Sequence, residues 1–150
     1  MIDDDEFEGL VRRIEPDLRR ALAGHLPRDA IADALAEAFA YAWQHRERIM
    51  KMENPTGYLY RVAQSRSRSR RQGFLPWDTD TRVPDVEPGL FGALRELSPS
   101  QLRAVWLVHG CGWTYGETAV ALHVSASTVG SHISRALDHL RDRLGVTSNG

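Results

Sequence analysis

Residues Thr114–Leu144, TYGETAVALHVSASTVGSHISRALDHLRDRL, have the pattern of two helices joined by a tight turn. Thr114 and Glu117 have the spacing of a capping box, in which the threonine oxygen accepts an amide hydrogen and the glutamate reaches back to the cap. This pair predicts a short helix over residues 115–122. Ser125 is a favoured N-cap for a longer helix after the turn. The stretch therefore predicts a helix-turn-helix.

The longer helix has two distinct faces. Apolar residues recur every three or four positions and predict a stripe that packs inward: Val129, Ile133, Ala136, Leu137, Leu140 and Leu144. The other face carries short hydrogen-bonding side chains and a cation: Ser127, Thr128, Ser131, His132 and Arg135. Such side chains at an exposed helix start suit the major groove of DNA. Capped helix pairs also occur in proteins that bind no nucleic acid, so this stretch alone leaves both functions open.

The composition is that of a globular chain without a strong overall charge. Its 150 residues are 42% hydrophobic, enough for one domain or two small ones, and the formal net charge is -1. Any affinity for nucleic acid must therefore come from local patches or from a larger assembly.

The residue content disfavours several classes of protein. The single cysteine, Cys111, excludes an internal disulfide, and no cysteine or histidine cluster has zinc-ligand spacing. We find no nucleophile elbow or phosphate loop, so we expect neither an enzyme nor a bound metal or cofactor. No signal peptide is recognisable and no apolar run approaches the ~20 residues of a membrane span, so we expect a cytoplasmic protein without a membrane contact.

The N-terminal part carries two helical patterns. Pro16 is expected to kink or divide the first helix. The second is expected over about residues 28–45, with Trp43 on its buried side. Asp33 and Glu37 lie four residues apart on another face, which is either an ordinary solvated face or a contact surface.

The pair Asn54-Pro55 predicts the start of a third helix, because asparagine caps well and proline is favoured at the first helical position. This helix begins aromatic and ends basic, with serines between Arg61, Arg66, Arg68, Arg70 and Arg71. Rings can stack on bases and guanidinium groups can neutralise phosphates, so the pattern suits a nucleic-acid surface. The helix dipole alone also favours arginines at a helix end, so both interpretations stay open.

Residues 73–89 interrupt the helical patterns. With three prolines and four acids, this stretch has the composition of an extended acidic linker. Helical patterns resume at residue 90 and continue into the helix-turn-helix. We therefore predict an all-α protein of two small helical bundles, residues 1–72 and 90–150, joined by this linker.

Nearly the whole chain resembles one bacterial family, the extracytoplasmic-function sigma factors of the short kind that has only sigma regions two and four. Residues 97–144, LSPSQLRAVWLVHGCGWTYGETAVALHVSASTVGSHISRALDHLRDRL, are similar in every helix to region four. Residues 54–71, NPTGYLYRVAQSRSRSRR, are similar to region two, as are Asp33, Glu37, Phe39, Ala42 and Trp43. His123 replaces the glycine that is usual in the turn, and we expect left-handed geometry there.

The resemblance implies a promoter-recognition subunit of bacterial RNA polymerase. Region two would dock on the core enzyme through Asp33, Ala36 and Glu37. It would capture the melted minus-ten element through Asn54, Tyr58, Arg61, Gln64, Arg66 and Arg68. Region four would read the minus-thirty-five element through Ser127, Thr128, Ser131, His132 and Arg135. The implied partners are core RNA polymerase and promoter DNA, with an anti-sigma factor as a further candidate.

Two other functions remain open at this point. A stand-alone regulator could use the helix-turn-helix as a dimer on a palindromic site, although it would not need the N-terminal bundle. A degenerate sigma-like protein could bind polymerase or an anti-sigma factor without initiating transcription. Ala36, Gly130 and His132, where the family usually has glutamine, lysine and arginine, keep this last alternative open.

Overall fold

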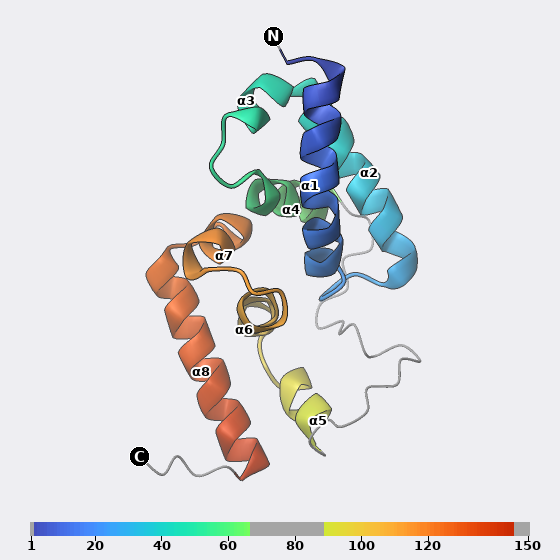
Figure 1. The fold of residues 1–150 in the computed structure, drawn as a ribbon. Coiled ribbons are helices and arrows are strands. Elements are labelled where there is room, and N and C mark those ends of the chain that lie inside the picture. The colour runs from blue at the N-terminus through green and yellow to red at the C-terminus, as the bar shows by residue number, and fades with distance from the viewer. Residues whose placement is uncertain (1, 67–88, 146–150) are drawn as a thin grey trace.

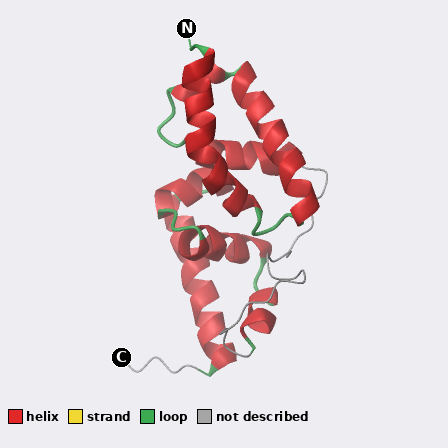
Figure 2. Ribbon diagram, turned by 45° about the vertical axis from the view of Figure 1, so that its right-hand side comes forward, coloured by secondary structure: helices red, strands yellow, loops and turns green. Residues whose placement is uncertain are grey.

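The computed structural model describes residues 2–66 and 89–145, and every regular element among them is a helix (Figures 1 and 2). The predicted all-α class is therefore confirmed. The predicted linker lies outside the described residues except for Gly89. The elements are α1 Asp4–Leu22, α2 Arg28–Gln44, α3 Arg46–Met50, α4 Pro55–Arg66, α5 Leu90–Arg95, α6 Pro99–Val105, the π-helical turn η1 Trp106–Gly110, α7 Tyr115–Leu122 and α8 Ala126–Leu144. None of these helices is both long enough and apolar enough to cross a membrane.

Helices α1 to α4 form the first half of the fold. A capping box opens α1, in which the Asp3 side chain accepts from the Glu6 amide at 2.8 Å. The prediction that Pro16 might divide this helix is wrong. Pro16 is exposed, and its neighbours Ile14 and Leu18 are buried and hold the helix on the core.

Two features of this half differ from the sequence prediction. Trp43 was expected inside but is 39% exposed. Its ring makes an edge contact with Phe7, with the ring centres 5.2 Å apart, and the Arg46 guanidinium lies 4.0 Å from its centre. The short helix α3 has no helical period in the sequence. Its buried Ile49 fixes it to the core.

The second half is a helix-turn-helix supported by α5 and α6. The predicted capping box of α7 is present, with Glu117 N–H donating to the Thr114 side chain at 3.0 Å. Its core is built from small and branched side chains where the helices cross: Ala104, Ala119, Val129 and Ile133. Small Ala119 lets α7 and α8 approach closely.

The two halves pack directly against each other, with α4 lying against α7 (Figure 1). Tyr60 meets Trp113 edge-on at 6.0 Å, and both rings are buried in a core shared by the two halves. Trp106 donates from Nε1 to the carbonyl of Arg20 at 3.1 Å. A Cβ at position 24 would overlap the Trp106 indole. The glycine at position 24 therefore permits this contact between the halves.

Candidate nucleic-acid interface

Helix α8 has the two faces that its sequence predicts. The first turns of the inward stripe are buried: Val129, Ile133 and Ala136. On the other side Ser127, Ser131 and Arg135 are exposed, whereas Thr128 and His132 are half-buried. The Thr128 hydroxyl lies 2.9 Å from that of Ser125, which also accepts from the Thr128 amide at 3.1 Å. Thr128 therefore takes part in the helix cap as well as lying at the helix start.

The turn before α8 has the predicted left-handed residue. His123 has φ 58° and ψ 47°, which confirms the expectation for this position. The Val124 amide donates to the carbonyl of Ala119 at 3.1 Å, and the His123 amide to that of Val120 at 3.3 Å. These bonds satisfy the last carbonyls of α7 and fix the angle between the two helices.

Three arginines surround two tyrosines on the surface of the first half. The hydroxyls of Tyr41 in α2 and Tyr58 in α4 lie 3.0 Å apart. Arg48 of α3 donates to the Tyr41 hydroxyl at 2.6 Å and lies 5.5 Å from the centre of the Tyr58 ring. Arg66 lies 5.0 Å from the Tyr41 ring and Arg61 lies 5.1 Å from the Tyr58 ring. We call these five residues the arginine–tyrosine cluster.

The cluster combines two properties that favour single-stranded nucleic acid. The hydrogen bond from Tyr41 to Tyr58 lowers the pKa of Tyr41, as does the neighbouring Arg48 cation. The hydrogen bond between Arg48 and Tyr41 in turn raises the pKa of Arg48. Arg48 and Arg66 are exposed, and both rings are partly exposed. Rings beside accessible cations can stack on bases while the guanidinium groups contact phosphates.

Two members of the cluster were missed by sequence reasoning. Tyr41 belongs to a helix whose predicted role was polymerase contact, and Arg48 follows a polar stretch without helical period. Residues 41–48, YAWQHRER, mix aromatic and basic side chains much as α4 does. That composition is the signal that could have pointed to them.

Three of the predicted minus-ten residues face the second half. Asn54 donates from Nδ2 to the carbonyl of Glu117 at 3.4 Å. Arg61 Nη1 lies 2.6 Å from Nδ1 of His123. Gln64 lines a cavity between the halves. The structure therefore brings part of the predicted minus-ten set against the helix-turn-helix.

The predicted polymerase-binding residues lie on the outside of α2. Asp33, Ala36 and Glu37 are all exposed. A Glu37 oxygen lies 3.9 Å from Arg66 Nη1, and a pair this exposed contributes little to stability. Arg68, the remaining predicted minus-ten residue, lies outside the described residues.

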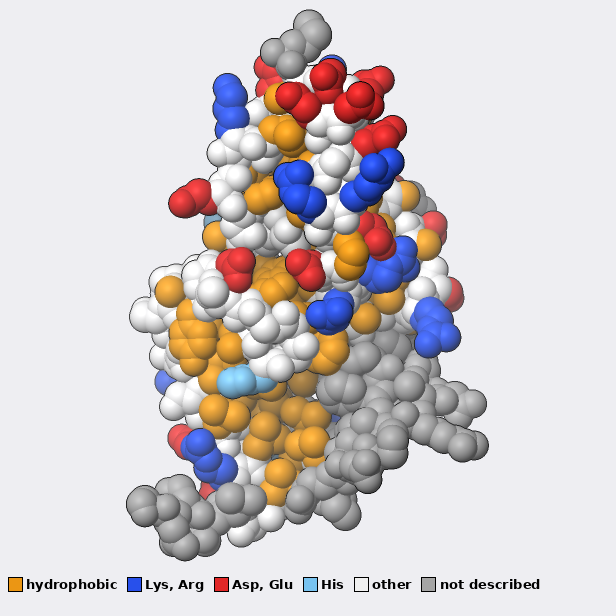
Figure 3. All heavy atoms as spheres, in the orientation of Figure 1, with side chains coloured by type: hydrophobic (Ala, Val, Ile, Leu, Met, Phe, Trp, Pro, Cys, Tyr) orange, Lys and Arg blue, Asp and Glu red, His pale blue; other side chains and the backbone are white. Residues whose placement is uncertain are grey.

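The acidic side chains are unevenly distributed. Figure 3 shows them gathered over the start of α1, where Asp4, Asp5 and Glu6 occupy the first turn. The formal net charge of -1 therefore conceals local differences. The arginine–tyrosine cluster is one such local concentration of positive charge.

No metal site accompanies these surfaces in the described part of the chain, where no group of three or more histidine, cysteine or acidic residues is placed to hold an ion. Burial raises the pKa of the Cys111 thiol to about 12, so this cysteine stays protonated at neutral pH.

Comparison with known proteins agrees with this geometry. The family model for sigma-70 region 4 matches residues 90–140. The RNA polymerase sigma-E factor of Streptomyces antibioticus is 34% identical over 152 residues, which span 93% of this chain and 84% of that protein. The chain belongs to the extracytoplasmic-function sigma factors of the sigma-70 family. The predicted family is confirmed, and with it the function of a promoter-recognition subunit of RNA polymerase.

Two solved structures share the fold of this sigma factor. RpoE of Bartonella quintana, in complex with the anti-sigma factor NepR, has a TM-score of 0.66 and 19% identity, over 94% of this chain and 98% of that one. CnrH, in complex with the cytosolic domain of CnrY, has a TM-score of 0.66 and 22% identity, over 97% of this chain and 92% of that one. Both matches extend across the two halves.

Proposed function

We propose that this sigma factor divides promoter recognition between two surfaces. The arginine–tyrosine cluster holds the melted minus-ten strand, and α8 reads the minus-thirty-five element. Asp33 and Glu37 of α2 contact core RNA polymerase. The polymerase supplies the catalysis, in the cytoplasm, and this chain supplies specificity.

The observation that carries the proposal is the arginine–tyrosine cluster. Guanidinium groups and rings from three helices converge on one accessible surface, with Arg48 placed against both Tyr41 and Tyr58. This arrangement supplies stacking and phosphate contacts together, which single strands require. A stand-alone regulator of duplex DNA would have no use for it.

Run-off transcription tests the proposal. Purified core polymerase, with and without this chain, is given genomic promoter fragments, and we expect defined transcripts only when the chain is present. An absence of transcripts together with retained polymerase binding would favour the sigma-like interaction module instead.

The contact with core enzyme is tested by charge reversal. Asp33→Lys combined with Glu37→Lys should abolish co-purification with core polymerase and leave the helical circular dichroism intact. A matched control is Asp4→Lys with Glu8→Lys, which reverses two exposed acids at the same spacing on α1. Equal co-purification of both double variants would contradict the assigned role of the α2 acids.

An anti-sigma factor is the third partner that we propose. The support is that both similar solved structures are complexes with a second protein, named as an anti-sigma factor for RpoE. Affinity purification of the tagged chain from its native cells, followed by mass spectrometry, tests this. Recovery of polymerase subunits alone would contradict it.

We also propose that residues 1–72 and 90–150 are separate folding units. The buried core of the first half takes in only Leu107, Trp113 and Ala121 of the second half, which has two further core clusters of its own. Proteolytic cleavage within residues 73–89 should leave the helical signal nearly unchanged. Loss of helicity in either fragment would contradict this division.

A further inference from the structure

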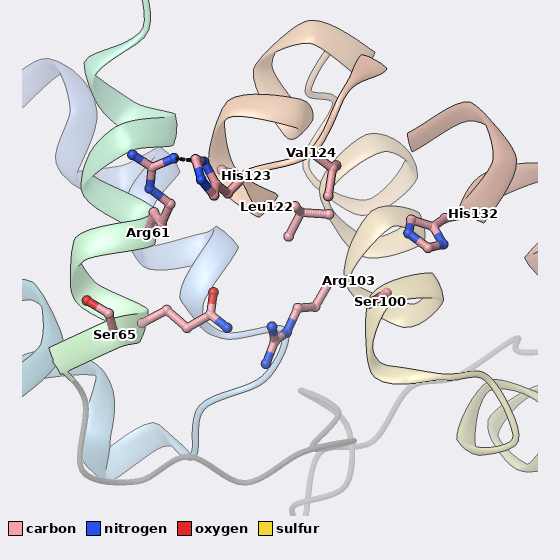
Figure 4. Close-up of a pocket in the computed structure, with 10 residues that line it drawn as sticks. Arg61, Ser65, Ser100, Arg103, Leu122, His123, Val124 and His132 are labelled. Carbon is pink, nitrogen blue, oxygen red and sulfur yellow. Dashed lines mark hydrogen bonds between the residues drawn. The ribbon is translucent and has the colours of Figure 1, made fainter. Parts of the chain in front are cut away.

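A cavity lies where α4 meets the second half of the sigma factor (Figure 4). It has a volume of 280 Å³. Helices α4, α6, α7 and α8 and the turn after α7 all contribute to its walls: Arg61, Gln64, Ser65, Ser100, Arg103, Ala121, Leu122, His123, Val124 and His132. Figure 4 shows Arg61 and Arg103 reaching it from different walls.

The polar part of this cavity is basic. Two guanidinium groups and two imidazoles line it, and none of the lining residues that the structure describes is acidic. With its amide oxygen turned toward Arg103, Gln64 accepts hydrogen bonds from both terminal nitrogens of that guanidinium. Neither Arg61 nor Arg103 forms an ion pair with a carboxylate in the described ranges. Two positive charges therefore face one cavity without a negative partner in the described part of the chain.

The contact between Arg61 and His123 preserves this charge. A guanidinium can only donate, so Nδ1 of His123 accepts from Arg61 at 2.6 Å and the imidazole carries its proton on Nε2. A neutral imidazole does not compensate a cation. The other N–H groups of Arg61 form no hydrogen bond to a residue that the structure describes.

We propose that this cavity binds a compact phosphate-bearing molecule. Guanidinium groups match phosphate oxygens in pairs, and the Ser100 hydroxyl of the lining can donate a further hydrogen bond, whereas that of Ser65 donates to the Val62 carbonyl. Ala121, Leu122 and Val124 form an apolar wall against which a ring can pack. The volume lies near the lower limit of small-molecule cavities, roughly 300 Å³, so the ligand is no larger than a mononucleotide.

Such a ligand joins the two halves. Arg61 comes from α4 and Arg103 from α6, so binding stabilises the packed arrangement by mass action. While the ligand is bound, Arg61, Gln64 and His132 are not free to contact DNA. The loss of these DNA contacts rests on the proposed function, whereas binding of the phosphate-bearing ligand to the cavity does not.

Isothermal titration calorimetry on the 150-residue chain tests the proposal, with ADP, inorganic pyrophosphate and adenosine as probes at constant ionic strength. We expect saturable binding of the two phosphates and none of adenosine. Arg61→Gln and Arg103→Gln should each weaken binding by about tenfold or more, since each removes charged hydrogen bonds. Arg12→Gln, at an exposed arginine of α1, should leave it unchanged.

The relative affinities identify the source of the phosphate. Tighter binding of ADP indicates a nucleotide whose base packs on the apolar wall, and equal binding indicates inorganic phosphate chemistry. Absence of saturable binding by both phosphates, or unchanged affinity in both arginine variants with native circular dichroism, would overturn the proposal. No promoter enters this measurement, so its failure would leave the proposed function standing.

Discussion

Helix α8 and the arginine–tyrosine cluster are both proposed DNA-binding surfaces, but they are assembled in different ways. All the predicted contacts of α8 lie on one helix, and its buried stripe decides which of them face outward. The cluster takes its residues from α2, α3 and α4 and exists only when those helices are packed. The comparison shows that the outward face of one helix can be specified locally, whereas the arginine–tyrosine cluster depends on tertiary assembly.

The largest effect should come from breaking the cluster. Tyr58→Ala combined with Arg48→Ala removes one stacking face and one cation, and should weaken binding of a single-stranded minus-ten oligonucleotide to the polymerase complex by about 3–5 kcal/mol. Fluorescence anisotropy with a labelled oligonucleotide measures this. Tyr115→Ala with Arg12→Ala, which removes an exposed ring and an exposed cation elsewhere, is the control. Equal losses in both would show that the cluster is not the binding surface.

A smaller effect is expected on α8. Arg135→Ala should weaken binding of duplex upstream DNA by about 1–3 kcal/mol if the guanidinium contacts a guanine, and should leave single-strand binding unchanged. Electrophoretic mobility shifts with each type of DNA separate the two. Arg141→Ala, near the exposed end of the same helix, is the control. A loss on single strands would contradict the division between the surfaces.

Acid should weaken the first half selectively, through a buried histidine. His25 is 3% exposed, Nδ1 lies 3.2 Å from the Tyr60 hydroxyl, and Nε2 has no hydrogen-bond partner among the residues that the structure describes. Burial, with a contribution from Arg103, lowers the pKa of His25 from 6.5 to about 3. As the pH falls, His25 is therefore protonated in the unfolded chain before it is protonated in the folded one. The free energy of unfolding is at its full value above pH 6.5 and falls by up to about 1.4 kcal/mol per pH unit below it.

Urea denaturation of the whole chain at pH 7 and pH 5 measures this loss. His25→Phe should reduce the difference between the two pH values, because the substituted ring cannot be protonated. His109→Phe, at an exposed position of the second half, should not reduce it. An unchanged pH dependence in His25→Phe would contradict the assignment.

The smallest effect concerns the charge of α8. Gly130→Lys with His132→Arg should raise affinity for the upstream element modestly and steepen its logarithmic salt dependence by about 2, because each phosphate neutralised releases counterion. A Cβ at position 130 would lie 3.5 Å from the Tyr115 ring, an ordinary contact, so the lysine fits. Gly130→Ala strengthens the helix without adding charge and should leave the salt dependence as it is. An unchanged salt dependence in the double variant would contradict the proposal that this face of α8 lies against DNA.

The second half was predicted closely because its signals are local. The capping box at Thr114, the cap at Ser125 and the left-handed His123 each involve residues at most a few positions apart. Hydrogen bonds of this kind form within one turn, so both partners can be recognised from a short stretch of sequence. The position of Trp43 was predicted wrongly because helical period does not report its contacts with Phe7 and Arg46.

The sequence by itself determined the helices other than α3, the inward face of α8 and the family. Only the tertiary structure decided where the side chains of α4 lie, including that Arg61 contacts both Tyr58 and His123. Helical period and caps act over a few residues, whereas these contacts join residues tens of positions apart. They depend on close approaches between the halves, such as the Trp106 indole against Gly24, that no local pattern reports.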